Sequence, residues 1–194
     1  AANGRFSSAV GLDIALRWLV IGRKRLEEKR LSAQLICADI SNPPFKPGQF
    51  SHVLALDVID HIDALEPALV SLRGQLRQHG RLWLSATNKR WLGPHPSSRV
   101  WAAAYRSAAS RRVRGESGDY DPLRFVSWRT PGQVRRTCKA AGLDVLEVCP
   151  SRISAAPGRQ ALSARGYNFL RRSRVLSRLL VFMGPFFQLT ARRR

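Results

Sequence analysis

The sequence predicts an α/β protein built on a doubly wound, mostly parallel sheet. Short apolar runs at residues 8–13, 34–39, 52–57 and 81–86 have the length of buried strands, and amphipathic segments at 14–30 and 64–77 separate two pairs of them. Strands linked by helices of this length pair in parallel through right-handed crossovers. With 194 residues, 44% of them hydrophobic, the chain can form one core, and we expect a single domain over 1–194.

The periodicity of apolar residues supports the two helices. The apolar positions of the first helix are Ile14, Leu16, Trp18, Leu19, Ile21 and Leu26, and those of the second are Leu65, Leu69, Leu72 and Leu76. Gly80 is expected to end the second helix. The segment 41–49 contains three prolines and a glycine, which exclude regular structure there.

The second half of the chain is less regular. We expect a loop at 88–98, a helix at 100–113 and a polar segment at 114–122. Thr130 and Pro131 are typical of a helix start, and that helix should run to Ala141, with Gly142 after it and a strand at 143–148. A helix at 167–183 and a last strand at 185–191 complete the prediction. The domain would thus comprise a cofactor-binding half at 1–87, an insertion on the acceptor side at 88–125, and C-terminal helices and strands at 126–194.

The composition limits the partners and the compartment. The formal net charge of +20 would attract nucleic acid, anionic lipid or an acidic substrate, although arginine-rich surfaces also arise from genome composition. The three cysteines have neither zinc-site spacing nor the density of a secreted disulfide scaffold. We therefore expect no metal site and a reducing, cytoplasmic setting. We also expect no transmembrane segment, since no apolar run approaches the roughly 20 residues that span a bilayer. The apolar residues of 167–187 are expected to be buried against the sheet, and peripheral membrane contact is the alternative.

Three of the predicted strands end in aspartate, at Asp13, Asp39 and Asp57. Ligands of parallel sheets bind at the carboxyl ends of the strands. A carboxylate at the first end can accept hydrogen bonds from a ribose diol, and one at the second can accept a bond from the exocyclic amine of adenine. These residues indicate an adenosine pocket. The alternative is that such residues cap helices, as Asp13 could do for the helix that follows it.

Several motifs occur in a characteristic order between residues 8 and 148. They are Val10-Gly11-Leu12-Asp13-Ile14, Ala38-Asp39-Ile40, Pro43-Pro44-Phe45 followed by Phe50-Ser51-His52-Val53, Ala55-Leu56-Asp57-Val58-Ile59-Asp60-His61-Ile62, Gly80-Arg81-Leu82-Trp83-Leu84-Ser85, and the segment 128–142. In these motifs the chain resembles the class I S-adenosylmethionine-dependent methyltransferases of the type 11 group. His52 departs from the pattern, because the family usually has aspartate there.

The resemblance implies S-adenosylmethionine as the cofactor. Asp13 would hold the ribose hydroxyls, Ile14 would pack on the adenine or ribose, and Asp39 and Ile40 would contact the adenine. Leu56 and Asp57 would line the pocket near the methionine portion. Methyl transfer depends mainly on positioning, and a base is needed only if the acceptor must lose a proton. His61 and His95 are the candidates for that role.

The chain departs from the family at its start. The family's first strand and glycine-rich loop should precede Ser8 by about 20 residues, whereas seven residues stand there. We expect the chain to be truncated at its N-terminus, with impaired cofactor binding. Loss of a central strand would also leave an unpaired edge in the sheet.

The predicted function is methyl transfer to a small molecule or a lipid precursor. The segment 88–125, with Trp91, Trp101, Tyr105 and Tyr120, would roof the acceptor pocket. One alternative is an RNA methyltransferase, and another is a non-catalytic basic binding module on a degenerate fold. A nicotinamide dehydrogenase fits less well, because of the motifs at Asp39 and at Asp57 to His61. The acceptor, the methylated atom and the oligomeric state are not determined by the sequence.

Overall fold

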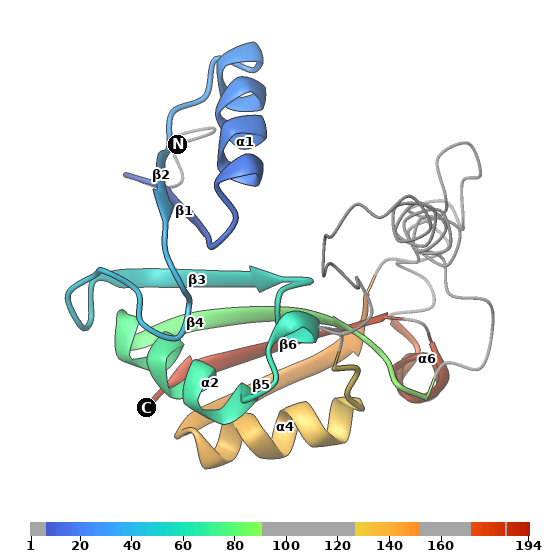
Figure 1. Ribbon diagram of the computed structural model, residues 1–194. Helices are drawn as coiled ribbons and strands as arrows, with labels where there is room; N and C mark the ends of the chain where they lie inside the picture. The colour runs from blue at the N-terminus through green and yellow to red at the C-terminus, as the bar shows by residue number, and fades with distance from the viewer. Residues whose placement is uncertain (1–6, 91–126, 152–171, 185) are drawn as a thin grey trace, which may run out of the picture.

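The computed structural model describes residues 7–90, 127–151, 172–184 and 186–194 (Figure 1). The strands are β1 (Val10–Asp13), β2 (Gln34–Cys37), β3 (Phe50–Leu56), β4 (Leu76–Thr87), β5 (Leu143–Pro150) and β6 (Phe186–Arg193). The helices are α1 (Leu16–Glu28), the short 3-10 helix η2 (Ile59–His61), α2 (Leu65–Gln75), α4 (Pro131–Ala140) and α6 (Arg174–Met183). The expected helix at 100–113, and most of the expected acceptor-side insertion, lie outside the described residues.

The strands form two sheets. β3, β4, β6 and β5 make a four-stranded sheet in that order, in which β3 and β4 are parallel and β6 runs antiparallel to both of its neighbours. β1 and β2 form a separate parallel pair, which lies beyond β3 in Figure 1. The predicted α/β class is confirmed, as is parallel pairing for β1 with β2 and for β3 with β4, while the two antiparallel pairings of β6 make the four-stranded sheet mixed. Within the described residues, β1 pairs only with β2 and β3 pairs only with β4.

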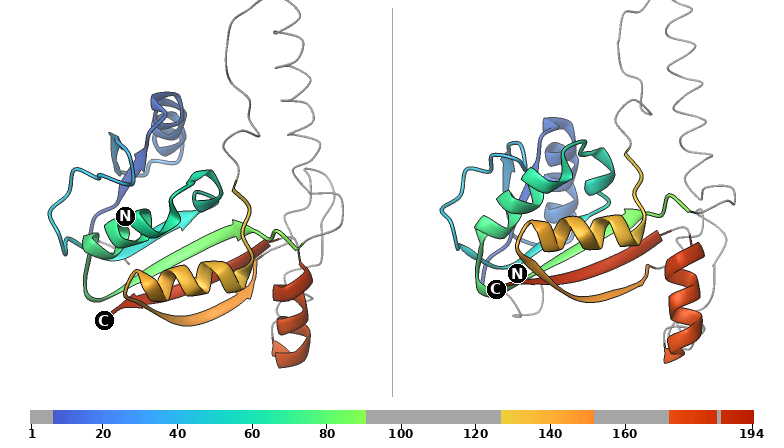
Figure 2. Two further views of the ribbon diagram at one scale, coloured as in Figure 1. Left: turned by 60° about the horizontal axis from the view of Figure 1, so that its bottom comes forward. Right: turned by 90° about the horizontal axis from the view of Figure 1, so that it is seen from below.

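The core lies between the four-stranded sheet and the helices α2 and α4, which cover the same face of it (Figure 2). Its largest fully buried side chains include Ile59, Leu69, Leu82, Leu84, Val134, Leu143, Phe187 and Leu189. Buried residues alternate along β6 up to Ala191, as expected where one face is buried, whereas the end of β4, from Leu84 to Thr87, is buried throughout. The carboxyl ends of β3, β4 and β5 therefore have a rigid support.

The helix α4 begins as the sequence predicts. The Thr130 hydroxyl accepts a hydrogen bond from the Gln133 N–H at 3.2 Å, and the Gln133 side chain accepts one from the Thr130 N–H at 2.8 Å. This reciprocal pair is a capping box, with Pro131 in the first turn. Gly142 follows the helix with a φ of 77°, in the left-handed region that favours glycine.

Gly80 does not end a helix, and that prediction is wrong. The helix α2 ends at Gln75, and β4 starts at Leu76, so Gly80 lies inside the strand. The register with β3 shifts there, from Phe50 opposite Leu76 to His52 opposite Arg81. His79 adopts a left-handed conformation, and a Cβ on Gly80 would clash with the Arg77 carbonyl oxygen. Glycine is needed for a strand irregularity rather than for a helix cap.

Burial differs from the prediction in two helices. Of α1 only Leu19 is buried, while Leu16, Trp18 and Ile21 are exposed. The apolar residues of the C-terminal helix were expected to pack on the sheet, but no residue of α6 is buried. Periodicity identified both helices, but it does not show whether an apolar face has a partner.

The described residues contain no helix long and apolar enough to cross a membrane. None of the three cysteines forms a disulfide, and Cys37 is exposed while Cys138 and Cys149 are buried. Burial raises the pKa of the Cys138 thiol to about 12, so it stays protonated and unreactive.

Candidate functional site

Asp13 and Asp39 follow the two strands of the β1–β2 pair at the same edge. The parallel register places Asp13 opposite Cys37, and the next residue, Ala38, donates its N–H to the Asp13 carbonyl oxygen at 3.1 Å. One oxygen of each carboxylate is engaged locally, since Asp13 accepts from the Ala15 N–H and Asp39 from the Ser41 N–H, both at 2.8 Å. The other oxygen of each accepts no hydrogen bond from the described residues. Both carboxylates thus retain an acceptor for a ligand.

The two isoleucines beside these carboxylates lie in different surroundings. The side chain of Ile14 is 70% exposed and offers an apolar surface next to Asp13. Ile40 is half-buried and packs against the core, and its carbonyl oxygen accepts a hydrogen bond from the Ser71 hydroxyl at 3.0 Å. Ile14 is therefore placed to contact a ligand, whereas Ile40 fixes the turn that contains Asp39.

Asp57 terminates β3 in a left-handed conformation, with a φ of 57°. Its N–H donates to the Ser85 hydroxyl oxygen at 2.9 Å, and that hydroxyl donates to the Asp57 carboxylate at 2.7 Å. Leu56, the last residue of β3, is 48% exposed. Aspartate is among the non-glycine residues that adopt this backbone conformation most often. Ser85 positions Asp57, a role that the sequence analysis did not assign.

Asp60 is a second residue that the sequence analysis did not single out. Its side chain is buried, with Oδ2 accepting from the Thr87 N–H at 2.9 Å and Oδ1 without a partner. Burial raises the pKa of Asp60, and the hydrogen bonds of Thr87 oppose this effect, while nearby Asp57 adds to it. The only available signal was its place in the motif that begins at Ala55.

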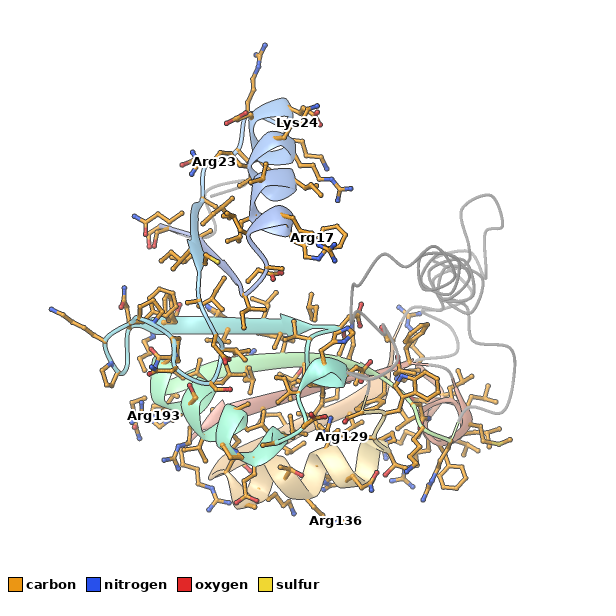
Figure 3. All side chains as sticks on the ribbon, viewed as in Figure 1. Arg17, Arg23, Lys24, Arg129, Arg136 and Arg193 are labelled. Atoms are coloured by element: carbon orange, nitrogen blue, oxygen red, sulfur yellow. The ribbon has the colours of Figure 1, made fainter. Side chains whose placement is uncertain are left out.

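Arg129 holds the segment after β3 in place (Figure 3). Its guanidinium donates to the carbonyl oxygens of Ile59 and Ser127 at 2.8 and 2.9 Å, and to those of Ile62 and Asp63 at 2.5 and 2.9 Å. Burial lowers the pKa of Arg129, and the charges of Asp60 and Asp63 act in the opposite direction. An arginine that donates to four backbone carbonyl oxygens has a structural role, and Arg129 holds the segment at the carboxyl end of β3.

The structure describes only one of the two predicted catalytic histidines. His61 is exposed at the end of η2, directly after the Asp57 segment. His95 lies outside the described residues. The structure thus brings together Asp13 with Asp39 on one sheet, and Leu56, Asp57 and His61 on the other. Among the described residues no cluster of side chains is suited to a metal ion.

Comparisons with known proteins agree with this geometry. Residues 1–84 match the family described as "Methyltransferase domain". An uncharacterized protein of Methanocaldococcus jannaschii is 34% identical over 82 residues, which are 42% of this chain and 33% of that protein. The chain thus spans about a third of the length of that curated relative.

Solved structures share the fold at low sequence identity. A SAM-dependent methyltransferase from Thermotoga maritima superimposes with a TM-score of 0.60 at 14% identity, covering 96% of this chain and 73% of that one. A SAM-dependent methyltransferase from Methanosarcina mazei gives 0.60 at 11% identity, covering 96% and 82%. The cyclase SpnF gives 0.59 at 15% identity, covering 96% and 66%. The chain therefore has the class I methyltransferase fold, and its residues 1–84 are similar to the methyltransferase-domain family.

Proposed function

We propose that this protein transfers a methyl group from S-adenosylmethionine to a small molecule or a lipid precursor. The observation that carries the proposal is the pair of strand-end carboxylates, Asp13 and Asp39, within the segment that matches the methyltransferase family. Each has one carboxylate oxygen that bonds to no described residue.

The donor set fits the adenosine part of the cofactor. The Asp13 carboxylate would accept hydrogen bonds from the ribose hydroxyls, and the Asp39 carboxylate would accept one from the adenine amine. The exposed side chain of Ile14 would cover one face of the nucleoside. Ile40 packs on the core, so its contribution would be to hold Asp39 in position.

The edge formed by β3 and β4 would hold the methionine end of the cofactor, which carries the methyl group. Leu56 is half-exposed there, and the bond from the Ser85 hydroxyl fixes the Asp57 carboxylate. The cofactor supplies an activated methyl group when bound, so the protein has only to position donor and acceptor. His61, exposed one short helix beyond Asp57, would take the proton from an acceptor that must lose one.

The proposal is tested by calorimetry with S-adenosylhomocysteine, comparing the unmodified chain with Asp13→Ala. Loss of charge-assisted hydrogen bonds worth roughly 1.5–3 kcal/mol should weaken binding about 10- to 100-fold. Asp144→Ala is the matched control, because Asp144 is an exposed carboxylate on β5 that pairs with Arg192 at 3.2 Å, and it should leave the affinity unchanged. Equal affinities of Asp13→Ala and Asp144→Ala for S-adenosylhomocysteine would contradict the proposal.

The charge of +20 favours RNA as the alternative acceptor. A non-catalytic basic module is the second alternative, and the cyclase SpnF illustrates that this fold serves proteins named for other activities. The strand-end carboxylates argue against a module that binds only polyanions, since negative charges at this edge would repel phosphate.

A further inference from the structure

The helix α6 exposes an apolar face. Along its ten residues, five apolar side chains are between 37% and 77% exposed, and they are Val175, Leu176, Leu179, Phe182 and Met183. Leu179 is three or four positions from each of the other four, so all five lie on one side of the helix. On the surface of a soluble protein, exposed apolar residues usually occur singly, whereas a contiguous set of this kind marks an interaction site.

The attachment of α6 keeps this face turned outward. The opposite side, with Ser177, Leu180 and Val181, is half-buried, and the helix packs on β5. The buried Asn88 amide donates to the carbonyl oxygens of Val181, Phe182 and Gly184 at 3.0, 3.2 and 2.9 Å. Figure 2 shows α6 standing off the end of the four-stranded sheet. The apolar face is therefore held away from the core by its own anchor.

The charges around this face are positive. Arg172, Arg174 and Arg178 are exposed, and α6 contains no acidic residue. Arg90 lies over the Phe182 ring, with its guanidinium carbon 4.1 Å from the ring centroid. Beside α6 there is a hollow of about 430 Å³, lined by Arg90, Arg135 and Arg178 together with apolar side chains and Glu147. Guanidinium groups next to an exposed apolar face are complementary to a surface with anionic headgroups over acyl chains.

We propose that α6 docks the protein on an anionic phospholipid bilayer. The five apolar side chains enter the headgroup region, and Arg172, Arg174 and Arg178 contact lipid phosphates. Nucleic acid would use the arginines but leave the apolar face in water. The proposal does not rest on methyl transfer, because docking needs no cofactor.

Docking would present the carboxyl edge of the four-stranded sheet to the membrane. Asn88, which anchors α6, follows Thr87 at the end of β4, and Ser85 on the same strand holds Asp57. The candidate acceptor side would thus lie near the bilayer, as a lipid-soluble acceptor requires.

The test is co-sedimentation with vesicles, without cofactor. Vesicles of phosphatidylcholine with about a third phosphatidylglycerol are compared with vesicles of phosphatidylcholine alone. We expect binding to the anionic vesicles only. Leu179→Glu should lower the partition coefficient about tenfold or more, because it removes an inserted side chain. Arg178→Gln should lower it about fivefold.

Two matched controls separate docking from general charge and exposure. Val20→Glu makes the same change at a residue of α1 that is 60% exposed, and Arg136→Gln removes an exposed arginine from α4. Both should bind vesicles within twofold of the unmodified chain. The proposal is overturned if the unmodified chain stays in the supernatant or if Leu179→Glu binds normally. It is also overturned if α6 instead mediates a dimer that Leu179→Glu dissociates, as measured by analytical ultracentrifugation.

Discussion

Asp60 has one carboxylate oxygen bonded to the Thr87 N–H and one without a partner, in a buried position. Burial raises its pKa above the ordinary value of 3.8. The native carboxyl therefore binds its proton more tightly than the unfolded one, and the protein loses stability as pH rises from about 3.8 through the native pKa.

We predict that Asp60→Asn removes this pH dependence, because the amide oxygen still accepts from Thr87 and carries no charge. Urea unfolding between pH 4 and pH 8 measures how the free energy of unfolding changes with pH. Glu28→Gln, at an exposed residue, is the control and should keep the pH dependence of the unmodified protein. Asp60→Ala should cost about 1–3 kcal/mol, since it leaves the buried Thr87 N–H unsatisfied. An unchanged slope in Asp60→Asn would show that another group titrates.

At the scale of elements, the position of α6 depends on Asn88. Its amide donates to three carbonyl oxygens at the end of the helix, and its Oδ1 accepts from the Arg90 N–H at 3.1 Å. A helix end without such partners leaves buried carbonyls unsatisfied.

We predict that Asn88→Asp releases α6, because a carboxylate cannot donate to carbonyl oxygens. The amide hydrogens of residues 177–184 should exchange faster by tenfold or more, while those of α4 remain protected. Hydrogen exchange monitored by mass spectrometry measures both helices in one experiment, so α4 serves as the internal control. Equal protection of α6 in the two proteins would mean that its packing on β5 suffices.

For the whole molecule, the net charge is +20, and the basic side chains of the described residues lie on separate elements. Figure 3 shows Arg17, Arg23 and Lys24 on α1, Arg136 on α4 and Arg193 at the opposite end of β6 from α6. The Arg193 guanidinium donates hydrogen bonds to the carbonyl oxygens of Gly74 and Leu76. Charges placed in this way attract polyanions without defining one groove.

We predict that RNA binds this protein weakly and without sequence preference. The logarithm of the affinity should fall linearly with the logarithm of salt concentration, as counterion release requires. Fluorescence anisotropy with two unrelated single-stranded RNAs, from about 50 to 300 mM NaCl, measures this. Tight binding to one RNA at the highest salt would favour the RNA methyltransferase alternative.

Much of the fold follows from local sequence. The Thr130-Pro131 start of α4, the left-handed Gly142 and the parallel pairing of β1 with β2 were predictable, because capping, glycine conformation and hydrophobic periodicity act over a few residues. Asp13, Asp39 and Asp57 were predictable as site candidates for the same reason, since each directly follows an apolar run.

Only the tertiary structure decided how these parts are used. It placed Gly80 inside β4, paired Asp57 with Ser85 from 28 positions away, buried Asp60 and joined Asn88 to α6 across more than 90 positions. It also left the apolar face of α6 exposed where the sequence predicted burial. The sequence by itself determined the elements and the strand-end carboxylates, because short-range interactions specify them. Contacts between distant segments depend on packing and register, which no local pattern encodes.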